Sequence, residues 1–288
     1  MKWEGHRQSD NVQDRRGDTG SSWGGRGLGI GSIAIALLAW GVFGINPLTT
    51  LALLSGQTAT PSAPAPSTAK RPPANDRQAA FVATVLASTE DAWQHIFATA
   101  GARYQPPKLV LYRGATPTAC GTGQAAMGPF YCPADRKVYL DLDFFDTLAH
   151  RLGAPGEFAR AYVIAHEVGH HVQTLLGTTQ KVDALRGRIS QREQNALSVR
   201  MELQADCYAG IWARHSQQAR QWLEQSDLES ALNAAAQIGD DHLQRTQTGT
   251  VRPDTFTHGS SAQRQRWFQL GYQNGSVPAC DTFKAKTL

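Results

Sequence analysis

The chain has 288 residues, a formal net charge of +4 and a sequence pI near 8.9. A chain of this length can form one large domain or two smaller ones. The basic excess is small and part of it lies in the first 27 residues, so the composition shows no basic footprint of the kind found on nucleic-acid-binding proteins. We therefore expect no nucleic-acid partner.

An uncharged stretch follows the N-terminal segment. No charged residue occurs from Gly27 to Ala69, and residues 28–45 are apolar except for Ser32. As a helix, this run would be about 27 Å long, close to the thickness of a bilayer core. We predict a single transmembrane helix over 28–45. A cleavable signal peptide is the alternative, but the preceding segment is long and no Ala-x-Ala pattern follows directly.

Basic residues predict the orientation of this helix. Because cytoplasmic flanks of membrane helices are enriched in Lys and Arg, residues 1–27 are expected to be a cytoplasmic tail and the rest of the chain to be exported. Residues 46–75 contain a stretch rich in Pro, Ala, Ser and Thr and would link the membrane to a folded domain over 76–288. The basic residues before the predicted helix are Lys2, Arg7, Arg15, Arg16 and Arg26.

The hydrophobic pattern predicts a helix-rich α+β domain with a small sheet. Residues 76–99 repeat apolar side chains at helical spacing. Residues 108–112 and 137–142 have the short pattern of strands, and the segment 114–133 between them is punctuated by glycine. Further helices are expected over 143–152, 155–176, 191–215, 226–245 and 261–272.

The four cysteines form an even set and contain no Cys-x-x-Cys pair, so they do not indicate a structural zinc site. In an exported domain they favour two disulfides, and three connectivities are open. We favour Cys120 with Cys132, because the short segment between them holds three glycines, which leaves Cys207 with Cys280. Free buried cysteines are the alternative.

The strongest chemical signal lies in the helix predicted over 155–176. His166, Glu167 and His170 form an HExxH motif, in which the two histidines lie on one helix face and can bind a single metal ion. Glu167 projects about 100° further around the helix, so its carboxylate lies beside the metal. There it can take a proton from metal-bound water. The ligand types favour zinc.

A catalytic zinc takes three protein ligands and keeps one position open, and the helix predicted over 191–215 offers the third ligand. Glu202 and Asp206 lie one turn apart on the same face. We assign Glu202 as the ligand and expect Asp206 to orient a ligand imidazole through its other N–H. An ordinary solvated acidic face is the alternative. The rival third ligands are isolated histidines: His215, His242 and His258.

The order of strand, metal-binding helix and third-ligand helix resembles a zincin. In zincins the substrate peptide pairs with an edge strand, for which 137–142 and 127–132 are both candidates. Several segments together resemble the putative neutral zinc metallopeptidases of bacterial membranes, the YpfJ-like family, over essentially the whole chain. These segments are Trp3-Glu4-Gly5, Arg15-Arg16-Gly17, the single predicted span, Gly128-Pro129-Phe130-Tyr131-Cys132-Pro133, the HExxH motif with His171 after it, the ExxAD motif from Glu202 to Asp206, and His258-Gly259-Ser260-Ser261 before Gln263-Arg264.

The resemblance implies a zinc metallopeptidase of the bacterial inner membrane that acts on a peptide or protein substrate. We expect His258 or Tyr208 to donate a hydrogen bond to the oxyanion that forms during hydrolysis. The alternatives are a non-enzymatic membrane-anchored interaction module with a structural metal, or a zinc amidase acting on cell-wall peptide. Glu167 argues against the interaction module, because a structural site gains nothing from a free carboxylate beside the metal.

Overall fold

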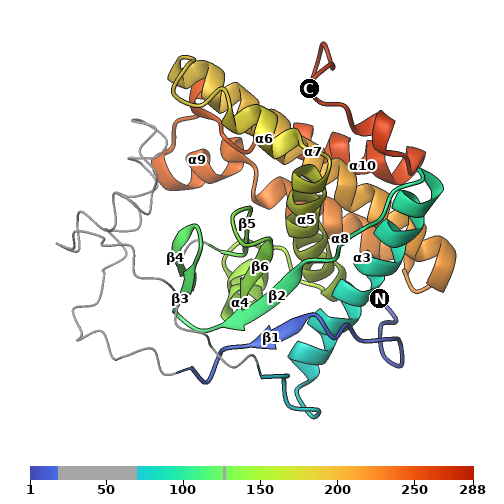
Figure 1. Ribbon diagram of the computed structural model, residues 1–288. Coiled ribbons are helices and arrows are strands. Elements are labelled where there is room, and N and C mark those ends of the chain that lie inside the picture. The colour runs from blue at the N-terminus through green and yellow to red at the C-terminus, as the bar shows by residue number, and fades with distance from the viewer. Residues whose placement is uncertain (19–69, 126–127) are drawn as a thin grey trace.

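The computed structural model describes residues 1–18, 70–125 and 128–288. Its main sheet has four strands in the order β1-β2-β6-β5 (Figure 1). The first three strands are parallel, whereas β5 pairs antiparallel with β6 and forms an edge of the sheet. The strands are β1 (Val12–Asp14), β2 (Lys108–Tyr112), β5 (Phe130–Cys132) and β6 (Lys137–Asp141).

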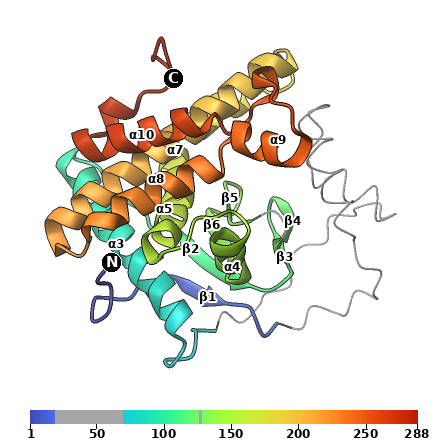
Figure 2. The ribbon, with the colours of Figure 1, turned by 180° about the vertical axis from the view of Figure 1, so that it is seen from behind.

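The helices lie mainly to one side of this sheet, with α5 in the centre of the molecule between the strands and the other long helices (Figures 1 and 2). Contacts join α5 to α3, α7 and α8, and to strands β5 and β6. The helices are α3 (Arg77–Thr99), α4 (Asp143–His150), α5 (Glu157–Leu175), α6 (Thr178–Asp183), α7 (Gln191–Arg220), α8 (Gln225–Gln237), α9 (Asp240–Thr248) and α10 (Ser261–Asn274), with 3-10 turns η2 (Pro253–Thr255) and η3 (Val277–Cys280).

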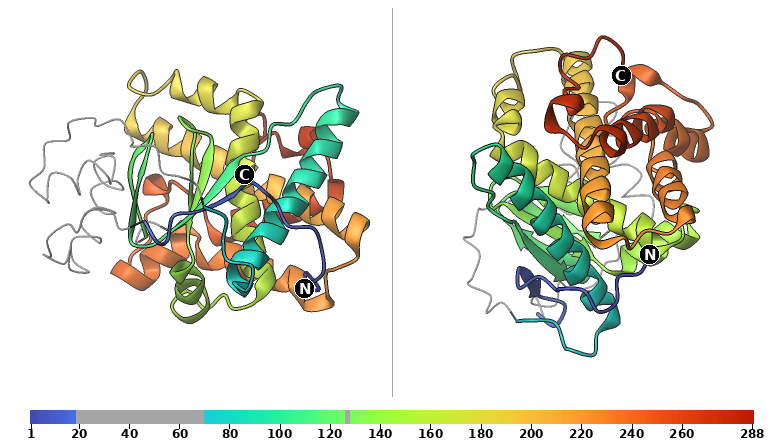
Figure 3. Two further views of the ribbon diagram at one scale, coloured as in Figure 1. Left: turned by 60° about the horizontal axis from the view of Figure 1, so that its bottom comes forward. Right: turned by 90° about the vertical axis from the view of Figure 1, so that its right-hand side faces the viewer.

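The two faces of the sheet have different coverings (Figure 3). Leu109 and Leu111 of β2 face the main core, whereas Val110 and Tyr112 join a smaller apolar cluster. Over that second cluster lies the hairpin of β3 (Ala115–Thr118) and β4 (Gly121–Gln124), whose Gly123 approaches the ring of Phe130 too closely for any larger side chain. Because successive residues of a strand point to opposite faces of the sheet, one set of β2 side chains packs against the helices and the other set packs under the hairpin.

Glycine allows the helices that carry the site to pack at backbone distance. A Cβ atom on Gly169 of α5 would lie 2.9 Å from the Ala205 carbonyl oxygen of α7. Gly210 of α7 faces the backbone of α10, and Gly271 of α10 faces the backbone of Cys207, in both cases with no room for a side chain. Helix α7 is therefore held tightly between α5 and α10, which fixes the positions of the groups that it carries.

The predicted α+β class is confirmed, and the predicted helices are found with small shifts at their ends. The helix predicted over 226–245 is divided at Gly239, where the Ser261 backbone approaches too closely for a Cβ atom. The helix predicted over 191–215 continues to Arg220 and ends at Gln221, which adopts a left-handed conformation. Its polar last turn carried no apolar repeat from which the extension could be predicted.

The first 18 residues belong to the folded domain, so the prediction of a separate tail is wrong for them. β1 pairs with β2, Trp3 is buried, and its indole donates a hydrogen bond to Glu157 at 2.9 Å. Arg16 forms ion pairs with Asp14 and Asp76, both at 2.6 Å. A three-residue strand with two polar residues has no pattern from which pairing can be predicted.

The predicted transmembrane helix over 28–45 and most of the predicted linker lie outside the described residues. In the described ranges, no helix combines the length and apolar character needed to cross a membrane.

Both favoured disulfides are confirmed. Cys120 is bonded to Cys132 with Cα atoms 5.8 Å apart, which joins the β3–β4 hairpin to β5. Cys207 is bonded to Cys280 with Cα atoms 5.7 Å apart, which joins α7 to the C-terminal turn η3. All four cysteines are therefore paired.

Candidate metal centre

Three candidate ligands converge between the middle of α5 and the middle of α7. Nε2 of His166 lies 3.1 Å from Oε2 of Glu202, and Nε2 of His170 lies 3.5 Å from Oε1. The three groups place their ligand atoms within 4.8 Å of one another. Neighbouring ligand atoms around a tetrahedral zinc ion with bonds of about 2.1 Å are roughly 3.4 Å apart. The observed spacing therefore fits a zinc ion at this point.

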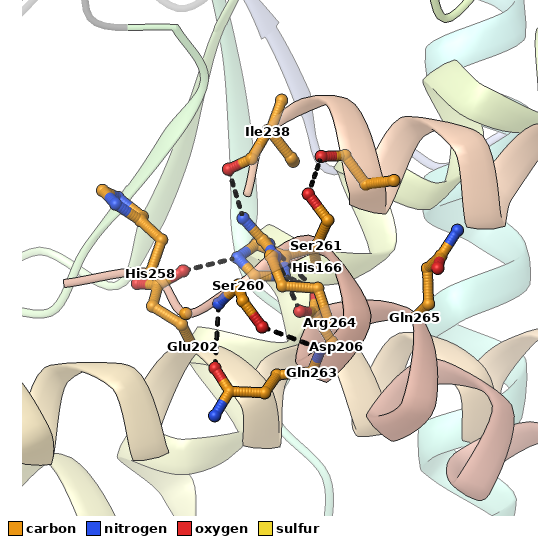
Figure 4. Close-up of polar contacts among 12 residues, drawn as sticks. His166, Glu202, Asp206, Ile238, His258, Ser260, Ser261, Gln263, Arg264 and Gln265 are labelled. Atoms are coloured by element: carbon orange, nitrogen blue, oxygen red, sulfur yellow. Dashed lines mark hydrogen bonds and ion pairs between the residues drawn. The ribbon is translucent and has the colours of Figure 1, made fainter. Parts of the chain in front are cut away.

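Asp206 and Arg264 support His166 on the side away from this point (Figure 4). Oδ1 of Asp206 lies 2.8 Å from Nδ1 of His166 and accepts a hydrogen bond from the Tyr162 hydroxyl at 2.5 Å. Arg264 donates to both carboxylate oxygens, from Nε at 2.8 Å and from Nη2 at 2.9 Å. Because the guanidinium stabilises the ionised carboxylate, Asp206 acts as an acceptor and the His166 ring proton lies on Nδ1.

Gln173 supports His170 in the corresponding way. Oε1 of Gln173 lies 2.9 Å from Nδ1 of His170, and its Nε2 donates to the Met201 carbonyl oxygen at 2.7 Å. A carbonyl oxygen can only accept, so the amide nitrogen must face Met201 and the amide oxygen must face His170. The His170 ring proton therefore also lies on Nδ1.

This arrangement leaves three electron-rich groups facing one another. In the neutral imidazoles both Nε2 atoms carry lone pairs, and the third group is the Glu202 carboxylate. Such groups repel unless protons or a cation lie between them. A divalent cation that competes with protons for the same lone pairs satisfies all three at once.

Buried charges shift the pKa values of these groups. Burial alone would lower the pKa of His166, but Asp206 and then Glu202 raise it to about 10. Burial alone would raise the pKa of Glu202, but the neighbouring His170 and His166 lower it well below its usual range. The pKa of Asp206 is lowered too, because Arg264 and His166 outweigh burial. Glu202 and Asp206 are therefore ionised at neutral pH, and a metal ion at this point must displace a proton from His166.

Glu167 lies beside the ligands and is 8% exposed. Burial raises the pKa of its carboxyl group, while the neighbouring His170 and His166 oppose the change. A carboxylate made more basic by burial is suited to taking a proton from water.

His258 lies in the loop before α10 and is held by Asp240. Nδ1 of His258 is 3.2 Å from Oδ1 of Asp240, whose other oxygen accepts from the backbone N–H groups of residues 257, 258 and 259 at 2.7, 2.6 and 3.0 Å. Burial alone would lower the pKa of His258, but Asp240 and Glu202 raise it. The negative charge of Glu202, a candidate metal ligand, thus favours the protonated form of His258.

The other candidates lie elsewhere. The Tyr208 ring packs edge-on against Trp93 in the core, with centroids 5.4 Å apart, so we do not retain it as an oxyanion donor. His215 lies 2.9 Å from the Gly275 carbonyl oxygen, and His242 lies on α9. Within the described ranges, His166, His170 and Glu202 are the one group of such side chains close enough to hold a metal ion.

Three supporting residues were not assigned a role from the sequence: Tyr162, Gln173 and Arg264. Gln173 lies one turn after His170, a spacing that allows side-chain contact on a helix. Arg264 lies on a helix distant in sequence, so only the packing of α10 against α7 reveals its contact with Asp206.

Comparison with known proteins agrees with this geometry. Over 290 aligned residues the chain is 51% identical to YpfJ of Escherichia coli (strain K12), covering 98% of this chain and 99% of that protein. It is 46% identical over 197 residues to Mb2605 of Mycobacterium bovis, covering 64% of this chain and 65% of that protein. No solved structure matches the chain. The family described as "Putative neutral zinc metallopeptidase" matches residues 1–283, and the chain belongs to this family.

Proposed function

We propose that the protein is a membrane-anchored zinc endopeptidase. The observation that carries the proposal is the convergence of His166, His170 and Glu202, with the Glu167 carboxylate beside them. When bound by these three ligands, zinc would supply a water molecule of lowered pKa and polarise the substrate carbonyl group. With zinc bound, Glu167 would act as the general base that takes a proton from the attacking water and would later return a proton to the leaving amine.

His258 is the proposed donor to the oxyanion. Asp240 fixes the ring through Nδ1 and is itself held by backbone N–H groups, so the donor is oriented before substrate binds. The influence of the Glu202 carboxylate on the pKa of His258 supports this role.

The edge strand β5 is the proposed binding site for the substrate backbone. Of the two segments considered from sequence, 137–142 contains β6, which lies between β2 and β5 in the sheet and has no free edge. β5 is an edge strand and contacts α5, the helix that carries the HExxH motif. An extended peptide hydrogen-bonded to β5 would therefore lie along that helix.

We infer a location outside the cytoplasm for the whole folded domain, with 28–45 as the proposed membrane contact. The two disulfides favour an oxidising compartment. Because β1 and β2 share one sheet and a bilayer cannot divide a sheet, residues 1–18 lie on the same side of the membrane as the metal centre. A single crossing over 28–45, with a cytoplasmic N-terminus and an exported domain, is therefore incompatible with this sheet, and we propose that 28–45 contacts the membrane while the parts before and after it lie on the same outer side.

Cysteines introduced at two exposed positions test this location. Gln8→Cys and Glu229→Cys should both react with a membrane-impermeant maleimide in intact spheroplasts. Labelling of Glu229→Cys alone would show that the N-terminal residues are on the cytoplasmic side.

Glu167→Gln tests the enzymatic proposal. Removing the base while keeping the ligands should lower peptide hydrolysis by about 10²- to 10⁴-fold with zinc content unchanged. The measurements are cleavage of a quenched fluorescent peptide library and metal analysis, with exposed Glu229→Gln as the matched control. Unchanged function in cells carrying Glu167→Gln would contradict the proposal and favour an interaction module. Loss of cell-wall peptide hydrolysis without any effect on protein substrates would favour an amidase.

A further inference from the structure

We propose that the Cys207–Cys280 disulfide orients the metal ligand His170 through two buried glutamine side chains, Gln204 and Gln173. The inference rests on the proposed metal site. It makes both glutamines positioning residues and makes the metal affinity dependent on the redox state of one disulfide.

A continuous chain of contacts runs from the disulfide to the ligand. The Cys280 carbonyl oxygen accepts from Nε2 of Gln204 at 3.0 Å. Oε1 of Gln204 accepts from Nε2 of Gln173 at 3.1 Å, and Oε1 of Gln173 lies 2.9 Å from Nδ1 of His170. Residues from η3, α7 and α5 are thereby joined in one line.

The direction of every hydrogen bond in this chain is fixed at its ends. The Cys280 carbonyl can only accept, so the Gln204 amide must turn its nitrogen toward Cys280 and its oxygen toward Gln173. The Gln173 amide nitrogen then has two acceptors, Gln204 and the Met201 carbonyl, and its oxygen is left for His170. The proton of His170 is thus held on Nδ1, and Nε2 is left for the metal.

Because the chain is buried, only protein groups can hold the Gln204 and Gln173 amides in this orientation. Gln173 and Cys280 are 0% exposed and Gln204 is 6% exposed, so water has little access to replace a lost partner. If the Cys280 carbonyl moves away, the Gln204 amide loses the contact that distinguishes its oxygen from its nitrogen. A Gln204 amide turned by half a rotation would present its nitrogen to the Gln173 nitrogen and weaken the support of His170.

The disulfide and a second attachment both hold Cys280 in place. Cys207, one residue after Asp206, carries the covalent link to Cys280. The hydroxyl of Thr282 donates to the Arg200 carbonyl oxygen at 2.7 Å, and the Arg200 side chain donates back to the Thr282 carbonyl oxygen. The disulfide acts on the Cys280 backbone directly, so we expect its loss to matter more than the loss of the Thr282 hydroxyl.

Zinc affinity measured by competition with a chromophoric chelator tests the chain. Gln173→Met, which keeps the side-chain length and removes the hydrogen bonds, should weaken zinc binding by about 10- to 100-fold, the usual effect of losing a group that orients a ligand. Gln204→Met and the paired change Cys207→Ser with Cys280→Ser should each weaken it by a smaller factor, about 10-fold or less, because the Met201 carbonyl oxygen still accepts from the Gln173 amide. The matched controls are Cys120→Ser with Cys132→Ser, and Gln218→Met at an exposed position of α7, both with unchanged affinity.

Nitrogen-15 NMR of the zinc-free protein, with its histidines isotopically labelled, distinguishes a break in this chain of hydrogen bonds from a general loosening of the fold. The hydrogen-bonded Nδ1–H signal of His170 should weaken in each chain variant, while the signal of His166 stays unchanged. Adding Gln204→Met to the disulfide-free variant should cause no further loss of affinity, because both changes break the same chain.

Two outcomes would overturn the proposal. One is unchanged zinc affinity in Gln204→Met, which keeps the disulfide and so remains informative if the cysteine variant does not fold. The other is full affinity in a folded disulfide-free variant. Peptide cleavage is measured separately: zinc binding that follows the chain without any peptide hydrolysis would contradict the proposed function and leave this inference standing.

Discussion

The two histidines of the metal centre are held in the same tautomer by opposite means. His166 faces the charged pair of Asp206 and Arg264, whereas His170 faces the neutral side chain of Gln173. In the first case an arginine keeps the acceptor ionised. In the second case a backbone carbonyl decides which atom of an amide is the acceptor.

This difference shows what each support depends on. The charged support requires a buried countercharge, and its loss leaves an ion without a partner in the core. The neutral support requires only correct orientation, and its loss leaves an unsatisfied amide. Damage to the first should therefore appear in folding stability as well as in metal binding, and damage to the second mainly in metal binding.

The largest effect is expected for Arg264→Met. This change removes the guanidinium that donates to both oxygens of Asp206, a carboxylate that is 0% exposed, and leaves only His166 and Tyr162 on its Oδ1 atom. The free energy of unfolding of the zinc-free protein should fall by about 3–5 kcal/mol, measured by urea denaturation. The double variant with Asp206→Asn should recover part of this loss, because the buried charge is removed with its partner. Equal losses in the single and double variants would show that Arg264 acts through packing alone.

A second comparison uses zinc affinity. In Asp206→Asn, either orientation of the amide turns its nitrogen toward a donor, Nε of Arg264 or Nδ1–H of His166. Chelator competition should show a loss near the upper end of about 10- to 100-fold, with Gln173→Met nearer the lower end. The hydrogen bonds of the two supports involve different residues, so their losses in free energy should add in the double variant. A loss in the double variant no larger than in one single variant would show that the two supports act as one unit.

Much of the metal centre could be predicted from the sequence because its ligands lie on two helices at fixed spacing. The i and i+4 positions of His166 with His170, and of Glu202 with Asp206, place each pair on one helix face wherever the helix lies. Their convergence then required only that α5 and α7 pack together, which Gly169 and Ala205 permit. This part of the prediction needed only the residue spacing within each helix.

The parts that could not be predicted depend on contacts between distant segments. β1 forms only because β2 offers it an edge, since its own three residues have no strand pattern. Arg264 and Asp206 are 58 positions apart, and nothing in either local sequence indicates the other. The break at Gly239 is imposed by the Ser261 backbone rather than by a helix-ending sequence.

A further expected effect depends on pH and concerns His171, a histidine of α5 that has neither a charged support nor a place at the metal centre. It lies 2.6 Å from the Gln105 carbonyl oxygen through Nε2 and 3.1 Å from the Tyr131 hydroxyl through Nδ1. Burial lowers its pKa to about 4. An exposed histidine has a pKa of about 6.5, so the unfolded chain takes up this proton first as the pH falls. His171 therefore contributes stability that is complete above about pH 6.5 and is lost toward pH 4, by about 3 kcal/mol at most.

His171→Gln removes this titration and keeps a group that can donate to the Gln105 carbonyl. The variant should be less stable than the natural protein at pH 7, because the ring packing is lost, and the difference should shrink as the pH falls toward 4. Urea denaturation of both zinc-free proteins across this range measures it, with His150→Gln at an exposed position as the control. Parallel curves from pH 7 to 4 would mean that His171 is protonated in the folded protein as easily as in the unfolded chain. In that case the surroundings of His171 would not disfavour a charged ring, and the uncharged support would be limited to His170 and Gln173.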